Sequence, residues 1–241
     1  MLLHKDPLFS IYFGDEREQL SPALCINYPE QFSTSEQYEK IKKALDIQTI
    51  MILRQVHGSD GLLITSYQDI KDILPFCHQG DYLVTNLAGI GIGIATADCL
   101  PIILYDKVFN ALAIVHAGWR GSIAGVATQA VARMQTVFGS NLEYVRVFFG
   151  PSACVCCYVV DDAVTDQLEP FWFKDQVVRN RNGDVFFDLP LFNELRLIDV
   201  GIKKKNIMRI YNECTICNES FCSYRRQGEK AGRQITVVAL Q

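Results

Sequence analysis

Residues 90–121 read IGIGIATADCLPIILYDKVFNALAIVHAGWRG. Three apolar segments, 90–96, 100–105 and 111–116, are separated by short polar breaks, a pattern that predicts three consecutive strands. A glycine-rich turn follows, and apolar residues then recur at helical spacing from 123 to 137. This stretch therefore predicts strands that lead into an amphipathic helix.

The rest of the chain continues this mixture. Further strands are predicted at Phe9–Phe13, Thr49–Val56, Tyr82–Thr85, Val145–Phe149, Asn206–Tyr211 and Ile235–Leu240. Further helices are predicted at Ser33–Leu45, over Val160–Leu168, and over Leu191–Ile198 with an end near Gly201. No repeat or linker is evident. We therefore expect one domain over residues 1–241, of the α/β class (α+β type), with mixed β-sheets layered with helices.

Composition narrows the function classes. The chain has 241 residues, of which 49% are hydrophobic and 21% charged, with a formal net charge of −4. This balance favours neither nucleic acid nor a membrane as a partner. No signal peptide is evident, and the apolar runs are too short and too polar to span a bilayer. Nine cysteines without a secretory signal predict reduced thiols and a cytoplasmic protein. The oligomeric state stays open.

Two of the four histidines stand at predicted strand ends, each followed closely by glycine. Taken alone, His57 or His116 also fits a hydrogen-bonded histidine near the core. Together with Cys99, they form a plausible three-ligand zinc site with a fourth position left for water. The separations of 42 and 17 residues match no short zinc-finger spacing, so the residue types carry this prediction.

Asp98 and Cys99 each allow a second interpretation. Adjacent side chains of an extended segment point to opposite faces, so Asp98 would orient a metal ligand or an arginine rather than bind the metal. A buried carboxylate satisfied by backbone amides fits equally well. Cys99 could also act as a nucleophile activated by a neighbouring histidine.

Several arginines could bind an anion. Gly118-Trp119-Arg120-Gly121 lies between a strand and a helix, where backbone amides and a guanidinium attract anions. A tight turn that needs glycine is the alternative, and we favour the anion site. Arg225, Arg226 and Arg233 add positive charge near the end of the chain, although such a run is often a solvated face.

The other cysteines give a weaker signal. Cys154, Cys156 and Cys157 cluster, and Cys214-Thr-Ile-Cys217 is a single C-x-x-C with Cys222 close behind. A structural zinc site usually has two such pairs, so the sequence disfavours a second metal site.

Six short motifs occur in order: Gln55-Val-His57-Gly58, Thr96-Ala-Asp98-Cys99-Leu-Pro101, His116-Ala-Gly-Trp-Arg120-Gly121, Gly150-Pro-Ser with Cys156-Cys157-Tyr158, Cys214-Thr215, and Ser223-Tyr-Arg-Arg226 with Gly232-Arg-Gln234. In these motifs the chain resembles the bacterial laccase-domain family, also named multicopper polyphenol oxidoreductases. Its members are now described as purine nucleoside phosphorylases with adenosine deaminase activity. The resemblance runs from about Gln55 to Gln234.

This resemblance implies a layered α/β fold and a metal site of two histidines and one cysteine, which falls on His57, Cys99 and His116. It also implies phosphorolysis of adenosine, inosine and methylthioadenosine, and deamination of adenosine. The substrates would be purine nucleosides and phosphate. Val160 departs from the family, whose members commonly carry an acidic residue after the Cys-Cys-Tyr motif, and this departure puts the range of nucleosides in doubt.

Residue inventory argues against laccase chemistry. A multicopper oxidase needs a blue-copper site and a separate histidine-rich copper cluster, which four histidines cannot supply. Zinc is therefore favoured over copper. For deamination, zinc lowers the pKa of the attacking water, and Asp98 is the candidate proton carrier. For phosphorolysis, Arg120 with Arg225, Arg226 or Arg233 would hold the phosphate.

Two other functions stay open. In the first, Cys99 with His57 or His116 hydrolyses an amide without metal, and because relatives are linked to the editing of peptidoglycan precursors, a muropeptide is the natural substrate. The second is a metal-binding interaction module without catalysis. We rank it lowest, because an open three-ligand site beside clustered arginines suits catalysis better.

Overall fold

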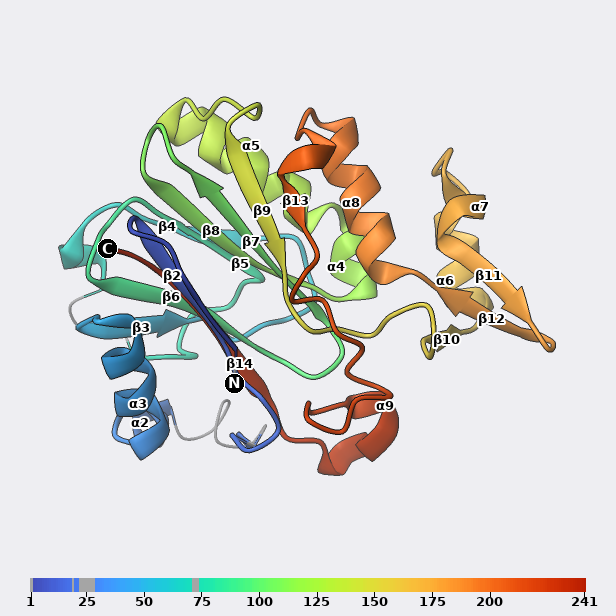
Figure 1. Ribbon diagram of the computed structural model, residues 1–241, viewed down its shortest axis with the longest axis horizontal. Coiled ribbons are helices and arrows are strands. Elements are labelled where there is room, and N and C mark those ends of the chain that lie inside the picture. Colours follow the sequence, from blue (N-terminus) through green and yellow to red (C-terminus); the bar gives the residue numbers. More distant parts are fainter. Residues whose placement is uncertain (1, 19, 22–28, 71–73) are drawn as a thin grey trace.

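Two β-sheets lie face to face at the centre of the protein, and helices cover their outer sides (Figure 1). The computed structural model describes residues 2–18, 20–21, 29–70 and 74–241. The five-stranded sheet has the order β1 (Leu2–Lys5), β2 (Phe9–Phe13), β14 (Gln234–Leu240), β6 (Ile90–Thr96), β3 (Thr49–Ile52). The six-stranded sheet has the order β13 (Ile207–Met208), β9 (Val145–Phe149), β7 (Leu100–Asp106), β8 (Ala111–Ala117), β5 (Tyr82–Thr85), β4 (Gly61–Ile64).

Three apolar clusters hold these layers together. Between the two sheets, side chains such as Phe9, Ile92, Ile103 and Phe148 are buried against one another. The helices α4 (Trp119–Ala124), α5 (Val126–Phe138) and α8 (Leu189–Asp199) cover the six-stranded sheet, and α2 (Pro29–Ser33) and α3 (Glu36–Leu45) cover the five-stranded sheet. The predicted mixed α/β architecture of layered sheets and helices is confirmed.

A smaller sheet extends from this body. Its three antiparallel strands have the order β10 (Val159–Val160), β12 (Asp184–Phe187), β11 (Val178–Arg181). Short helical elements accompany it and the end of the chain: α6 (Asp162–Thr165), α7 (Lys174–Val177) and α9 (Tyr224–Gln227), with single 3-10 turns at Tyr67–Asp69, Asp166–Leu168, Lys204–Asn206 and Gly228–Lys230. In the described part of the chain, no helix has the length and apolar character needed to cross a membrane.

Several predicted elements differ from the structure in extent. The helix predicted over Val160–Leu168 is wrong at its start, because Val160 pairs with Val185 in a strand. The predicted helix Ser33–Leu45 is split, and α3 begins after Ser35, whose side chain accepts a hydrogen bond from the amide of Tyr38. The predicted strand Asn206–Tyr211 is reduced to the two residues of β13.

The chain passes directly from one large sheet to the other at residues 97–99, between β6 and β7. This crossing is tight, and Asp98 adopts a positive φ of 82°. Such a conformation is uncommon for a residue other than glycine and is sustained by surrounding contacts. Cys99, the next residue, is thereby brought to the end of both sheets. The predicted strand Thr49–Val56 ends at Ile52, so that residues 53–60 form a loop that carries His57.

Candidate metal centre and active-site cavity

Three predicted ligands, far apart in sequence, meet at this end of the sheets. His57 comes from the loop between β3 and β4, Cys99 from the crossing before β7, and His116 from the end of β8. Each offers a ligand atom, and these atoms all lie within 4.8 Å of one another. The two imidazole rings are 4.8 Å apart between centroids and nearly perpendicular, at 80°. The structure therefore brings together the whole predicted ligand set.

Two glycines make this approach possible. A Cβ atom at Gly118 would lie 3.0 Å from Sγ of Cys99 and 3.2 Å from Cδ2 of His57. A Cβ at Gly121 would lie 2.8 Å from the carbonyl oxygen of Gly58, the residue after His57. Gly118 has an ordinary φ of −73°. Space beside the ligands, rather than backbone angle, is therefore what requires glycine here.

Asp81, which the sequence did not single out, supports two of the three ligands. Its Oδ1 lies 2.8 Å from Nδ1 of His116, and its carboxylate accepts hydrogen bonds from the backbone amides of His57 and Gly58 at 2.9 and 2.7 Å. Burial would raise the pKa of Asp81, but these partners outweigh burial and hold the pKa below its usual value. The carboxylate is therefore ionised and positions both histidines.

Cys99 and His116 also change each other's pKa values. Burial raises the pKa of the Cys99 thiol, but the charge of His116 and hydrogen bonds from both histidines outweigh this effect and lower the pKa to about 6. Burial lowers the pKa of His116, but the Cys99 thiolate and Asp81 outweigh it and raise the pKa to about 9. Cys99 is therefore a thiolate at neutral pH, which is the form that binds metals and attacks carbonyl groups.

The donor set suits zinc. With Nδ1 of His116 engaged by Asp81, its other ring nitrogen is free to bind a metal, as in carboxylate–histidine–zinc arrangements. Two imidazoles and one thiolate are ligands typical of a catalytic zinc site. The residues present therefore fit a single zinc ion with an open position.

A cavity of about 750 Å³ opens beside the three ligands and is lined by all of them. This volume lies in the range of small-molecule sites. Three of the four predicted anion-binding arginines, Arg120, Arg225 and Arg233, also line it. The guanidinium of Arg120 stacks over Trp119 at 4.2 Å, and that of Arg225 lies over Tyr158 at 5.0 Å, which limits the positions that each can adopt.

Arg226 is placed differently from the other three. Its guanidinium donates hydrogen bonds to the backbone carbonyls of Thr215, Ile216 and Phe221 at 2.6, 2.8 and 2.5 Å, and the residue is absent from the cavity lining. The structure therefore does not bring Arg226 to the cavity as the sequence predicted, because the guanidinium ties down the backbone of residues 215–221.

Asp98 is buried and lines the cavity. Its Oδ1 accepts a hydrogen bond from the Thr215 hydroxyl at 2.6 Å, and its Oδ2 accepts one from the backbone amide of Arg225 at 2.7 Å. Asp98 thus holds an arginine segment in place, one of the predicted arrangements. The sequence analysis also suggested that Asp98 orients a metal ligand. In the structure, Asp81 contacts the ligand His116 instead.

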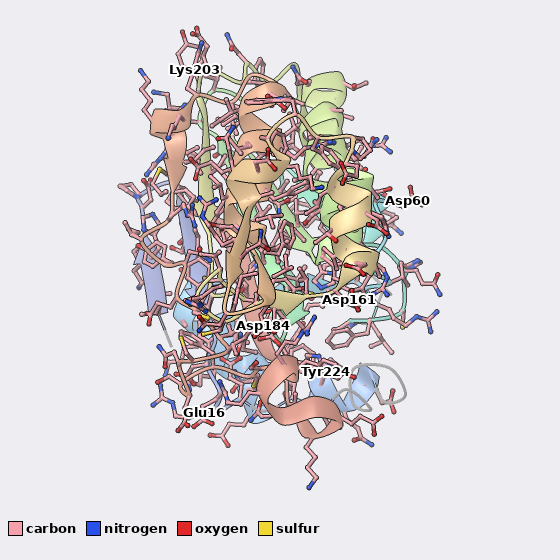
Figure 2. All side chains as sticks on the ribbon, turned by 90° about the vertical axis from the view of Figure 1, so that its right-hand side faces the viewer. Glu16, Asp60, Asp161, Asp184, Lys203 and Tyr224 are labelled. Atoms are coloured by element: carbon pink, nitrogen blue, oxygen red, sulfur yellow. The ribbon has the colours of Figure 1, made fainter. Side chains whose placement is uncertain are left out.

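Val160 does not face the cavity. Its side chain is buried in the core beneath the six-stranded sheet, whereas the next residue, Asp161, lines the cavity. Figure 2 shows Asp161, before α6, and Tyr224, at the start of α9, near each other on one face of the molecule. Both residues line the cavity, so a carboxylate is present here although position 160 is apolar.

Sequence comparison finds relatives with enzyme names. A purine nucleoside phosphorylase of Clostridium acetobutylicum is 28% identical over 236 residues, covering 97% of this chain and 93% of the relative. Adenosine deaminase RL5, from an unknown prokaryotic organism, is 34% identical over 201 residues, covering 80% and 76%. A purine nucleoside phosphorylase of Bacteroides thetaiotaomicron is 30% identical over 203 residues, covering 80% and 74%.

Solved structures share the fold. The YfiH hypothetical protein of Bacillus licheniformis superposes with a TM-score of 0.85 at 23% identity, covering 99% of each chain. YlmD from Geobacillus stearothermophilus superposes with a TM-score of 0.80 at 24% identity, covering 97% of this chain and 91% of that one. Residues 30–241 match the family model described as multi-copper polyphenol oxidoreductase laccase, and the chain belongs to this family.

Proposed function

We propose that this protein is a zinc-dependent purine nucleoside phosphorylase that cleaves adenosine, inosine and methylthioadenosine with phosphate, and that it also deaminates adenosine. The observation that carries the proposal is the convergence of His57, Cys99 and His116 on a cavity lined by arginines. The names of the relatives, purine nucleoside phosphorylase and adenosine deaminase, support the same reaction classes.

For phosphorolysis, Arg120, Arg225 and Arg233 would hold the phosphate dianion. A phosphate oxygen forms a bond to C1′ of the ribose while the bond from C1′ to the purine breaks, and the purine leaves with the electron pair and takes up a proton. Stacking on Trp119 and Tyr158 keeps two guanidinium groups in fixed positions before substrate binds, which lowers the entropic cost of orienting the phosphate.

For deamination, water replaces the amino group at C6 of adenine, and ammonia leaves. His57, Cys99 and His116 would hold the zinc ion, which when bound supplies a Lewis acid that lowers the pKa of water. Asp98 would carry protons at the cavity wall, while its two hydrogen bonds keep Thr215 and Arg225 in register. Asp81 would keep His116 in the orientation that binds the metal.

One paired experiment tests the proposal. The purified protein is analysed for metal and then incubated with adenosine, with and without phosphate, and the products are separated. Zinc in the protein, adenine that forms only with phosphate, and inosine that forms without it are expected. Treatment with a chelator should abolish both products, and added zinc should restore them. Turnover that survives complete zinc removal would contradict the proposal.

A second candidate is favoured by one specific arrangement. Cys99, His116 and Asp81 form a chain of nucleophile, base and orienting carboxylate, and Asp81 lies 2.8 Å from His116. This order is typical of thiol hydrolases. In this reaction, the Cys99 thiolate attacks an amide carbonyl of a peptidoglycan precursor, and the amine leaves with a proton from His116. Water then attacks the resulting thioester, which releases the carboxylate and restores the Cys99 thiolate. Amide hydrolysis by the metal-free protein, lost in Cys99→Ser, would establish this candidate, and its absence would exclude it.

A further inference from the structure

Two cysteine-bearing segments, distant in sequence, lie side by side behind the cavity wall. Residues 152 and 214 form a parallel β-bridge. The amide of Ser152 donates to the carbonyl of Glu213 at 3.0 Å, and the amide of Thr215 donates to the carbonyl of Ser152 at 2.9 Å. This short pairing sets the turn that contains Cys156 and Cys157 against the turn that contains Cys214 and Cys217.

The four sulfur atoms of Cys156, Cys157, Cys214 and Cys217 all lie within 4.8 Å of one another. Four sulfurs bound tetrahedrally to one zinc ion, each at about 2.3 Å, are about 3.8 Å apart. The cysteines are free thiols rather than disulfides. We propose that these four cysteines form a second, structural zinc site.

The turns around the cluster support a metal rather than a chance meeting of thiols. In the first turn, the amides of Cys157 and Tyr158 both donate to the carbonyl of Cys154, at 3.0 and 2.9 Å. In the second turn, the amide of Asn218 donates to the carbonyl of Cys214 at 3.1 Å. Backbone hydrogen bonds therefore close both turns and hold the two cysteine pairs in place for a metal ion. A site of four thiolates is closed, which is typical of structural rather than catalytic zinc.

The position of this cluster gives it a role. The amide of Ala153, just before the first turn, donates to the carbonyl of Asp98 at 2.8 Å, and the hydroxyl of Thr215, in the second turn, donates to the carboxylate of Asp98. Tyr158, just after the first turn, lines the cavity. A zinc ion that joins the two turns would therefore fix the cavity wall around Asp98.

Sequence spacing disfavoured this site because only one C-x-x-C pair is present. The second pair is the adjacent Cys156-Cys157, which no common zinc spacing includes, and only the pairing of residues 152 and 214 brings it to Cys214-x-x-Cys217. The inference stands apart from the proposed function, because metal content and thiol protection are read without any substrate.

Elemental analysis and alkylation test the proposal. Protein purified under reducing conditions is compared with a Cys156→Ser/Cys217→Ser double variant and with Cys77→Ser, which replaces an exposed cysteine outside the cluster. The double variant should hold one zinc equivalent fewer than the wild type, and Cys77→Ser the same amount. A His57→Ala variant should lose zinc from the other site and keep the cluster's equivalent.

Alkylation needs no variant and covers the case in which the double variant fails to fold. Cys77, Cys156 and Cys217 are all exposed, so without a metal iodoacetamide should reach all three, and chelation should change none of their rates. With zinc bound, Cys77 should react at once, while Cys156 and Cys217 should react only after chelation. Rates of Cys156 and Cys217 that chelation leaves unchanged, iron in place of zinc, or an unchanged zinc content in a folded double variant would overturn the proposal.

Discussion

Nδ1 of His116 lies 2.8 Å from Oδ1 of Asp81, and both side chains are almost completely buried, at 3% and 0% exposed. The two residues are also joined through the backbone: the amide of His116 donates a hydrogen bond to the carbonyl of Asp81 at 2.7 Å. The same carboxylate also holds the amides of His57 and Gly58. One residue just before β5 therefore sets the geometry of two of the three ligands.

Replacing Asp81 with asparagine should weaken metal binding about 10- to 100-fold, the usual effect of losing a carboxylate behind a histidine ligand. An amide in this place would also turn N–H donors toward the backbone amides of residues 57 and 58. Competition with a chelator measures the metal affinity. Asp60→Asn, which changes an exposed carboxylate on the loop that carries His57, is the control, and equal affinities in the two variants would contradict the role of Asp81.

In the metal-free protein, Cys99 should react with iodoacetamide with a midpoint near pH 6, because its pKa is lowered from 9.0 to about 6. His116→Asn removes the main charge that lowers this pKa and should move the midpoint upward by at least one unit. Mass spectrometry of the Cys99 peptide gives the rate at each pH. An unchanged midpoint in the variant would show that the two side chains are not coupled.

Together, Cys99 and His116 should not change how the stability of the folded protein depends on pH. The lowered pKa of Cys99 makes the folded state more stable as pH rises from about 6 to 9.0, and the raised pKa of His116 makes it less stable from 6.5 to about 9. The effects cancel, since the folded and unfolded pairs each hold one proton in this window. The pair therefore adds no slope to the pH dependence of stability between pH 7 and 8, and the iodoacetamide midpoint of Cys99 is the measurement that reports its coupling to His116.

The strands that end at the site were predictable because their signal is local. Tyr82–Thr85 and Ile90–Thr96 are continuous apolar runs and form strands at those bounds. Cys99 and His116 were found because their residue types stand out at strand ends. The β-strand at Val159–Val160 was missed because its two residues pair only with the distant β12, and the apolar residues at 160, 164 and 168 imitate a helix.

Asp81 was missed, and a second cysteine site was disfavoured, for a different reason. A single aspartate before a strand is common in sequences, and its partner His116 is 35 residues away. The bridge between residues 152 and 214, which brings Cys156 and Cys157 close to Cys214 and Cys217, leaves no periodic pattern either. Arg226 shows the opposite error: its charge indicated an anion site, but in the structure its guanidinium donates to four backbone carbonyls.

Arg120→Ala should raise the KM for phosphate about 10- to 100-fold, which corresponds to ~1.5–3 kcal/mol for hydrogen bonds to a charged group. The KM for the nucleoside should change much less. Initial rates with each substrate varied in turn separate the two constants. Arg179→Ala, on the exposed strand β11 and outside the cavity lining, is the control. Equal changes in both KM values would contradict phosphate binding by Arg120.

Arg226→Ala should act on stability instead. The guanidinium binds carbonyls of residues 215, 216 and 221, so its loss should lower the free energy of unfolding by about 2–3 kcal/mol. Denaturant unfolding measures this free energy. The KM for phosphate and the KM for the nucleoside should change by the same factor. A selective rise in the KM for phosphate without loss of stability would instead show that Arg226 binds the phosphate.

Gly118→Ala tests whether the ligands are as closely packed as the structure indicates. The new methyl group would lie 3.0 Å from Sγ of Cys99 and 3.2 Å from the ring of His57, so one ligand must move and metal affinity should fall at least tenfold. Gly58→Ala is the matched control, because its methyl group would meet only ordinary contacts at 3.5 and 3.7 Å. Both variants should fold, since neither glycine has a positive φ. If the two bound metal equally well, the close approach of Cys99 and His57 over Gly118 would not govern the site.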